Sequence, residues 1–158
     1  AEYWTYGFVV SIAVANSDTW ASEIGTLSRK QPFSILRLEK VEPGTSGAIS
    51  SLGTLAAIAG ASLIAIVSYF LWDGITTMAI FWIIIFGVVG CFIDTILGAT
   101  VQSAYRCKEC GKLVEKKIHC LQPTILVKGV SFVNNDVVNI SSILLASILM
   151  MFLSFFVR

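Results

Sequence analysis

The apolar run GFVVSIAVA (residues 7–15) leads without a break into the polar stretch NSDTWASEIG (residues 16–25). Ionisable side chains at membrane depth are costly and usually face a protein interior, so each one is a candidate functional residue. At about 100° per residue, Asn16, Thr19 and Glu23 share one face of a helix. No other stretch of the chain places so many oxygen donors on two helical turns. The pattern predicts a polar site at the end of a membrane helix.

The composition around this stretch is that of an integral membrane protein. Hydrophobic residues make up 56% of the 158 residues, charged residues make up 13%, and the mean hydropathy is +0.81. A soluble domain is roughly half apolar and about a quarter charged, so a soluble protein is excluded. The length allows one compact helical unit.

Four long apolar segments are predicted to cross the membrane as helices, at residues 3–24, 49–72, 75–102 and 137–157. Each has at least the roughly 20 residues that a spanning helix needs, and the third segment is longer than that. The runs are too long and too uniformly apolar for the alternating strands of a membrane barrel. We therefore predict an all-α, polytopic membrane protein with a single domain over residues 1–158.

The basic residues predict how these segments are oriented. Ten of the eleven Lys and Arg residues lie in the connections at residues 26–48 and 105–134. Cytoplasmic loops carry an excess of Lys and Arg, so both connections are expected in the cytoplasm. That topology puts every strongly placed acid at the cytoplasmic end of its segment; these acids are Asp18, Glu23, Asp94 and Asp136.

These four acids are the predicted catalytic residues, with Asp18, Glu23 and Asp94 as ligands of Mg²⁺. Magnesium prefers oxygen ligands and is typically held by one or two carboxylates together with substrate phosphates. Further oxygens are available from the amide side chains of Asn16, Asn135 and Asn139. The alternative is that these residues are interfacial polar groups that pack or cap helices, with Asp136 as the N-cap of the last segment.

The turn PGTSG (residues 43–47) comes shortly before the second segment. Exposed N–H groups and a following helix N-terminus favour phosphate, so Gly44, Thr45, Ser46 and Gly47 are predicted to bind it. Lys40 is the basic residue nearest this turn and the predicted charge partner. The turn is not a Walker A loop, because no Gly-Lys-Ser/Thr follows. Alternatively, Ser or Thr simply caps the next helix.

A third pattern, CKECG (residues 107–111) followed by His119-Cys120, lies in the second connection. Cys107, Cys110, His119 and Cys120 would make a Cys₃His set, which is typical of structural zinc. Adjacent His and Cys residues are an awkward pair for one ion. Reduced thiols or a redox pair are therefore the alternative.

The motifs NSDTWASEIG (16–25), PGTSG (43–47), DTILGA (94–99) and NDVVN (135–139) occur in an order that resembles one family of integral membrane proteins. This family includes transmembrane protein 19 and plant phytyl-phosphate kinase. Its members usually carry further hydrophobic segments ahead of the first motif, so the chain resembles the C-terminal portion of a member. Additional N-terminal membrane segments are accordingly expected as partners.

The resemblance implies Mg²⁺-dependent transfer of a phosphoryl group from a nucleoside triphosphate, such as CTP, to an isoprenoid monophosphate at the cytoplasmic leaflet. It also strengthens the assignment of phosphate binding to residues 43–47. The prenyl tail is expected in a groove along the small residues of the second segment, Gly53, Ala57 and Gly60. No nucleic acid is expected as a partner. Two alternatives remain open, a membrane cytidylyltransferase that forms a CDP-lipid and a non-catalytic transporter or assembly factor.

Overall fold

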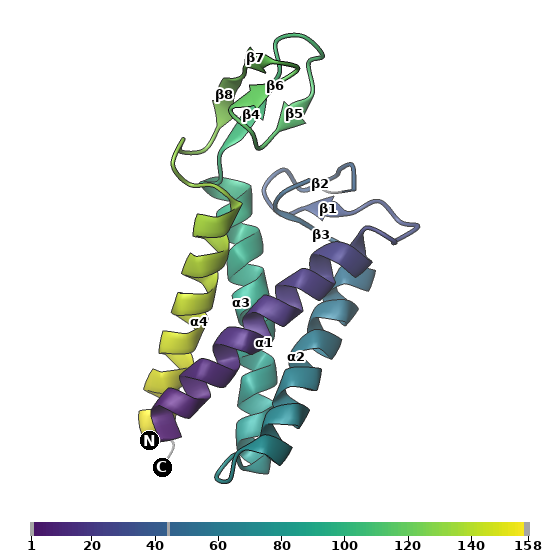
Figure 1. Cartoon of the computed structure of the whole chain (residues 1–158). Coiled ribbons are helices and arrows are strands. Elements are labelled where there is room, and N and C mark those ends of the chain that lie inside the picture. Colours follow the sequence, from purple (N-terminus) through teal and green to yellow (C-terminus); the bar gives the residue numbers. More distant parts are fainter. Residues whose placement is uncertain (1, 44, 157–158) are drawn as a thin grey trace.

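The computed structural model of the chain describes residues 2–43 and 45–156. Within these ranges the chain forms a four-helix bundle with two loops that project from one end (Figure 1). The helices are α1 (Glu2–Gly25), α2 (Ser51–Leu71), α3 (Thr77–Thr100) and α4 (Asn135–Phe156). Helix α1 runs diagonally across the bundle and contacts each of the other three helices.

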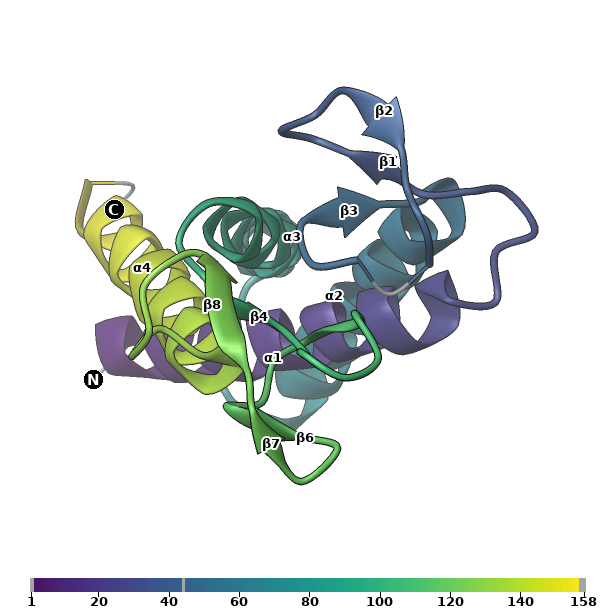
Figure 2. The same ribbon diagram turned by 90° about the horizontal axis from the view of Figure 1, so that it is seen from above.

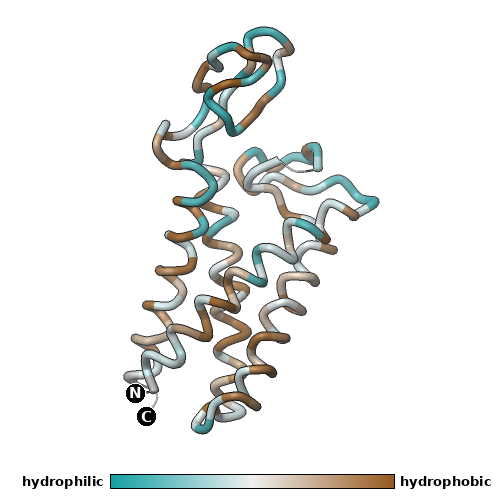
Figure 3. Tube along the Cα trace, in the orientation of Figure 1, coloured by the Kyte–Doolittle hydropathy of each residue, from teal (hydrophilic) through white to brown (hydrophobic). Residues whose placement is uncertain are grey.

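Three of the described helices are long and apolar enough to cross a membrane, namely α2, α3 and the part of α4 from Asn135 to Ser154. Figure 3 shows hydrophobic residues along these helices and hydrophilic residues concentrated in the two loops. Helix α1 has sufficient length, but its last turns carry the polar stretch of residues 16–25. A membrane-spanning role for α1, and the cytoplasmic position of the loops, stay predictions.

The helix ends differ from the predicted ones by one or two residues because capping side chains set them. Ser50 Oγ accepts a hydrogen bond from the Gly53 N–H at 3.0 Å, so α2 begins at Ser51. Asn134 Oδ1 accepts one from the Val137 N–H at 3.0 Å, so α4 begins earlier than predicted. Asp136 therefore lies inside the first turn of α4, and its prediction as the N-cap is wrong.

The prediction of an all-α fold is correct for the bundle and wrong for the loops, which contain short antiparallel strands. The first loop holds a sheet of order β2-β1-β3, formed by β1 (Phe33–Ser34), β2 (Glu39–Lys40) and β3 (Ala48–Ile49). The second holds a sheet of order β5-β4-β8, formed by β4 (Ala104–Arg106), β5 (Leu113–Val114) and β8 (Ile125–Lys128). A hairpin joins β6 (Ile118–His119) to β7 (Gln122–Pro123). Strands of two to four residues are too short to show a period-two pattern in the sequence.

Small residues allow α1 and α2 to approach closely, as their spacing predicts. A Cβ atom added to Gly53 would lie 2.9 Å from the Ala21 carbonyl oxygen, and one added to Gly60 would lie 3.1 Å from that of Asn16. Asn16 Nδ2 also donates to the Gly60 carbonyl oxygen at 2.9 Å. Helix α1 thus covers α2 at Gly60, so the predicted groove for a prenyl tail does not extend that far, whereas Gly53 and Ala57 line the main pocket described below.

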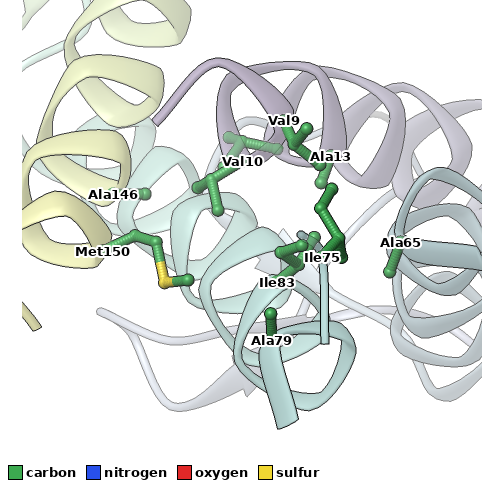
Figure 4. Packing of buried hydrophobic residues seen from close by; sticks show 10 residues of the cluster. Val9, Val10, Ala13, Ala65, Ile75, Ala79, Ile83, Ala146 and Met150 are labelled. Carbon is green, nitrogen blue, oxygen red and sulfur yellow. The ribbon is translucent and has the colours of Figure 1, made fainter. Parts of the chain in front are cut away.

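The core of the bundle is a cluster of buried hydrophobic side chains from all four helices (Figure 4). Its fully buried side chains include Val10 and Val14 of α1 and Ile83 of α3, with Met150 of α4 beside them. Helix α1 thus packs on the other helices through its apolar first half. This packing fixes the position of its polar second half relative to them.

We expect replacement of Gly90 by Ala to lower the free energy of unfolding by about 1–3 kcal/mol, because the added methyl group overpacks the core. A Cβ atom at Gly90 would lie 2.3 Å from Val14 Cγ2, and Val14 is buried and β-branched, so it has no other rotamer to adopt. Thermal unfolding in detergent measures the effect. Ile96→Val on the exposed side of α3 is the control; equal stability of Gly90→Ala and this control would contradict the prediction.

Candidate functional site

A pocket of about 540 Å³ lies at the loop end of the bundle, where the polar end of α1 meets α2, α3 and α4. The first loop closes it on one side, and Figure 2 shows both loops over this end of the helices. Three of the four acids predicted as catalytic line this pocket, namely Asp18, Glu23 and Asp94. Glu115 of the second loop adds a carboxylate that the sequence did not single out.

Asp94 is held by neutral donors from α4. Ser142 Oγ donates to Asp94 Oδ2 at 3.2 Å. With its amide turned so that the nitrogen faces the carboxylate, Asn139 donates to the same oxygen at 2.7 Å and to the Asn135 carbonyl oxygen at 3.3 Å. Asn135 and Asn139 both line the pocket. The first two turns of α4 thus fix the position of the α3 carboxylate.

Asp18 faces α3 from the neighbouring wall. The Cys91 thiol lies 3.8 Å from Asp18 Oδ1 and donates to it. Asp18 and Cys91 are both among the residues that line the pocket. Cys91 is buried on α3 and contacts this acid.

Three predicted site residues lie elsewhere in the structure. Asn16 points at α2, where it donates to the Gly60 carbonyl oxygen. Lys40 lies on the exposed strand β2 and does not line the pocket. Asp136 is exposed on α4 and does not line the pocket. Asn135 and Asn139 are four residues apart and share the helix face that lines the pocket, whereas Asp136 is rotated by about 100° from Asn135.

The turn before α2 contributes Thr45, Ser46 and Gly47 to the pocket, whereas Gly44 lies outside the described residues. The alternative that a Ser or Thr caps α2 is correct for Ser50, whereas Thr45 and Ser46 of the turn do not cap this helix. Gly47 has a φ of +80°, and an added Cβ atom would lie 2.3 Å from the Ala99 Cβ atom. Only glycine therefore lets the turn lie against α3.

A second pocket of about 410 Å³ adjoins the first and shares the hydroxyl residues Thr45 and Ser46 with it. This pocket is lined by two basic residues, Arg37 and Lys128. Lys128 Nζ donates to the Gly98 carbonyl oxygen at 2.9 Å. Partial burial lowers the pKa of Lys128, and the positive charge of Arg37 acts in the same direction. The basic side of the site thus comes from β8 and the first loop, not from Lys40.

A hydrogen-bonded chain of side chains links the two loops above the pocket. Ser46 Oγ donates to Gln102 Oε1 at 2.9 Å, and Gln102 Nε2 donates to Glu115 Oε1 at 2.9 Å. Gln102 is buried at the end of α3. Sequence reasoning missed Gln102, Glu115 and Lys128. The one available signal was the position of Gln102, the first amide side chain after a long apolar run.

The four residues predicted as zinc ligands come together in the second loop. The ligand atoms of Cys107, Cys110, His119 and Cys120 all lie within 4.8 Å of one another. A hydrogen bond from the Cys110 backbone N–H, followed by one from the His119 side chain, lowers the pKa of the Cys107 thiol below its usual range. This cluster is separate from the carboxylates that line the main pocket.

Comparison with known proteins places the chain among integral membrane proteins. The family described as integral membrane protein DUF92 matches residues 1–147. The chain is 35% identical to Protein PGR of Arabidopsis thaliana over 156 residues, which is 90% of this chain and 52% of the relative. An uncharacterized membrane protein of Methanocaldococcus jannaschii is 42% identical over 96 residues, with 61% of this chain and 40% of the relative covered.

The chain is also 29% identical to Protein VTE6, chloroplastic, of Arabidopsis thaliana over 151 residues, which is 96% of this chain and 38% of the relative. The chain thus spans about half the length, or less, of these curated relatives. No solved structure matches the chain. The family match covers nearly the whole chain, and the chain therefore belongs to the DUF92 family of integral membrane proteins.

Proposed function

We propose that the pocket carries out Mg²⁺-dependent transfer of a phosphoryl group from a nucleoside triphosphate to an isoprenoid monophosphate at the membrane surface. The convergence of Asp18 and Asp94 from two helices on one pocket, together with Asn139 from a third, carries this proposal. Resemblance to phytyl-phosphate kinase, drawn above from four motifs, suggests the substrate class.

No basic side chain among the described residues forms an ion pair with the carboxylates of the pocket. Among the described residues the one ion pair joins Arg37 and Glu39, at 3.6 Å on the surface. The pocket is lined by the carboxylates of Asp18, Glu23, Asp94 and Glu115. In the described part of the chain, none of these carboxylates has a Lys or Arg partner within salt-bridge distance. Close carboxylates repel one another unless a cation or a proton neutralises them. An oxygen-only donor set of this kind fits Mg²⁺.

In this proposal Asp18 and Asp94 hold Mg²⁺, with the Asn139 side chain beside them. When bound, the ion supplies charge neutralisation and alignment of phosphate oxygens, which is most of what phosphoryl transfer requires. Arg37 and Lys128 bind the triphosphate in the adjoining pocket, because both pockets share the turn at Thr45 and Ser46. The backbone N–H groups of Ser46 and Gly47 in that turn orient phosphate oxygens between the two pockets.

The lipid substrate enters from the side of α3. Phe92 lines the main pocket and is 39% exposed, so its ring belongs both to the pocket and to the outer surface of the bundle. This arrangement places the tail beside α3 rather than along the whole of α2, where α1 covers Gly60. A prenyl phosphate bound along Phe92 keeps its tail in the membrane while its head group reaches Asp94 on the same helix.

The proposal is tested by incubating the purified full-length protein in detergent with labelled CTP or ATP, Mg²⁺ and phytyl or geranylgeranyl monophosphate. Thin-layer chromatography is expected to show label in a lipid diphosphate, with release of a nucleoside diphosphate. Release of pyrophosphate with a nucleotidyl-lipid product would instead identify a cytidylyltransferase. Absence of any labelled lipid would contradict an enzymatic role and favour the transporter or assembly alternative.

A further inference from the structure

The cysteine and histidine cluster of the second loop already has the spacing of a metal site. His119 Nδ1 lies 3.6 Å from Cys110 Sγ and 3.2 Å from Cys120 Sγ. Cys107 Sγ belongs to the same group, in which all ligand atoms lie within 4.8 Å of one another. Ligand atoms of a tetrahedral zinc ion, bound at about 2.0–2.3 Å, lie roughly 3.3–3.8 Å apart. Small side-chain movements therefore suffice to place all four on one ion.

The hairpin between β6 and β7 explains how adjacent residues reach the same point. His119 pairs with Gln122, so Cys120 and Leu121 form a two-residue turn. Both turn residues have positive φ, 50° for Cys120 and 59° for Leu121. This conformation is unfavourable for residues other than glycine and persists where the surroundings enforce it. It turns the Cys120 thiol back toward the His119 ring, which overcomes the objection raised by their adjacency.

The second loop lacks the apolar core that would hold such a turn. In its described part from Ala104 to Lys128, the buried hydrophobic residues are Tyr105 and Cys107. Leu121 at the tip of the hairpin is 96% exposed. Units this small are usually stabilised by a disulfide or a metal, and all four cysteines of the chain are free thiols.

We propose that Cys107, Cys110, His119 and Cys120 bind one structural zinc ion that holds the second loop over the pocket. Three thiolates and one imidazole suit zinc, and a closed set of four protein ligands is typical of structural zinc sites. Magnesium, the ion proposed for the carboxylates, prefers oxygen ligands and does not compete for this site.

The chain segment between the proposed zinc ligands connects the zinc site to the main pocket. Glu115 lies between Cys110 and His119 in the chain, lines the main pocket and accepts the hydrogen bond from Gln102. Gln102 in turn accepts the hydrogen bond from Ser46 of the first loop. Zinc therefore positions Glu115, and through Gln102 it joins the two loops. This inference does not depend on the reaction proposed above.

The first test measures metal content in the full-length protein, purified in detergent without chelators. We expect close to one zinc ion per chain by mass spectrometry of metals, and visible absorption typical of tetrahedral, thiolate-bound cobalt when Co²⁺ replaces zinc. Iron at the same stoichiometry, no bound metal, or a Cys107–Cys110 disulfide under native conditions would each overturn the proposal.

Two matched variants locate the ion. Cys110→Ser is expected to weaken zinc binding at least about 100-fold, since even loss of an outer-shell partner weakens metal sites 10- to 100-fold. Cys91→Ser removes the one cysteine outside the cluster and is expected to leave the zinc content unchanged. Zinc retained in Cys110→Ser, or lost in Cys91→Ser with a folded bundle, would overturn the assignment.

A protease test reads out the ordering of the loop. The exposed Lys112, Lys116 and Lys117 lie between the zinc ligands Cys110 and His119, so trypsin can cut there once the loop opens. We expect removal of zinc to speed this cleavage at least about tenfold, because cleavage follows the population of the open form. Cleavage at the same rate with and without zinc would overturn the structural role of the ion.

Discussion

Asp94→Asn is expected to lower phosphoryl transfer to the isoprenoid monophosphate at least about 100-fold, a loss typical for removal of one charge-stabilising group from an active site. The substitution keeps the size of the side chain and its hydrogen bond from Ser142 Oγ, so the bundle stays folded. It removes the negative charge that would bind Mg²⁺, and the amide oxygen that remains is a weaker ligand. Initial rates at saturating nucleotide and several Mg²⁺ concentrations measure the loss.

Asp136→Asn is the matched control for this substitution. Asp136 carries the same charge and lies within five residues of Asn139, but it is exposed and does not line the pocket. We expect its activity to equal that of the wild type. Full activity in Asp94→Asn, or loss of activity in Asp136→Asn with an intact fold, would contradict the site derived from the structure.

Gly47→Ala is expected to lower activity about 100-fold, a loss known for a misplacement of about 1 Å within an active site. Its φ of +80° is unfavourable for alanine, and the added Cβ atom would lie 2.5 Å from the Ala99 Cα atom, which is backbone and cannot rotate away. The turn must therefore move away from α3, which displaces the pocket residues Thr45 and Ser46. Rates at varied nucleotide concentration and thermal unfolding measure the effect.

Gly74→Ala is the control for Gly47→Ala, because it carries the cost of alanine at a positive φ without displacing the turn that lines the pocket. Gly74 has a φ of +100°, and an added Cβ atom would meet nothing within 4 Å. It lies in the turn between α2 and α3, at the end of the bundle opposite the pocket (Figure 1). We expect a stability loss of about 1–2 kcal/mol and unchanged activity. Equal activity in Gly47→Ala and Gly74→Ala would contradict a role for the first turn in the site.

Much of the bundle is predictable because its signals are local. Apolar runs of about 20 residues predict long helices, and the small residues Gly53 and Gly60 predict close helix contacts; the structure has both. The gathering of Asp18, Glu23 and Asp94 at one end also follows from the sequence, because each lies at the same end of an up-and-down arrangement of segments.

The composition of the pocket depends on helix rotation, which the sequence does not specify. Asn139 and Asp136 are both polar residues at the start of α4, and both were predicted as site residues. Packing of Val138 and Ala146 into the bundle turns Asn139 toward Asp94 and leaves Asp136 exposed. Rotation of α1 likewise turns Asn16 to the Gly60 carbonyl oxygen while Asp18 lines the pocket.

The sequence by itself determined the helices, the polar end where the acids gather and the cysteine and histidine group of the second loop, because each is a property of residue type and short spacing. The tertiary structure decided which polar residues share the pocket. Lys128, Gln102 and Glu115 reach it through contacts between segments far apart in the chain, and Lys40 is excluded because β2 lies at an exposed edge. Long-range contacts of this kind depend on how the helices pack and leave no local pattern in the sequence.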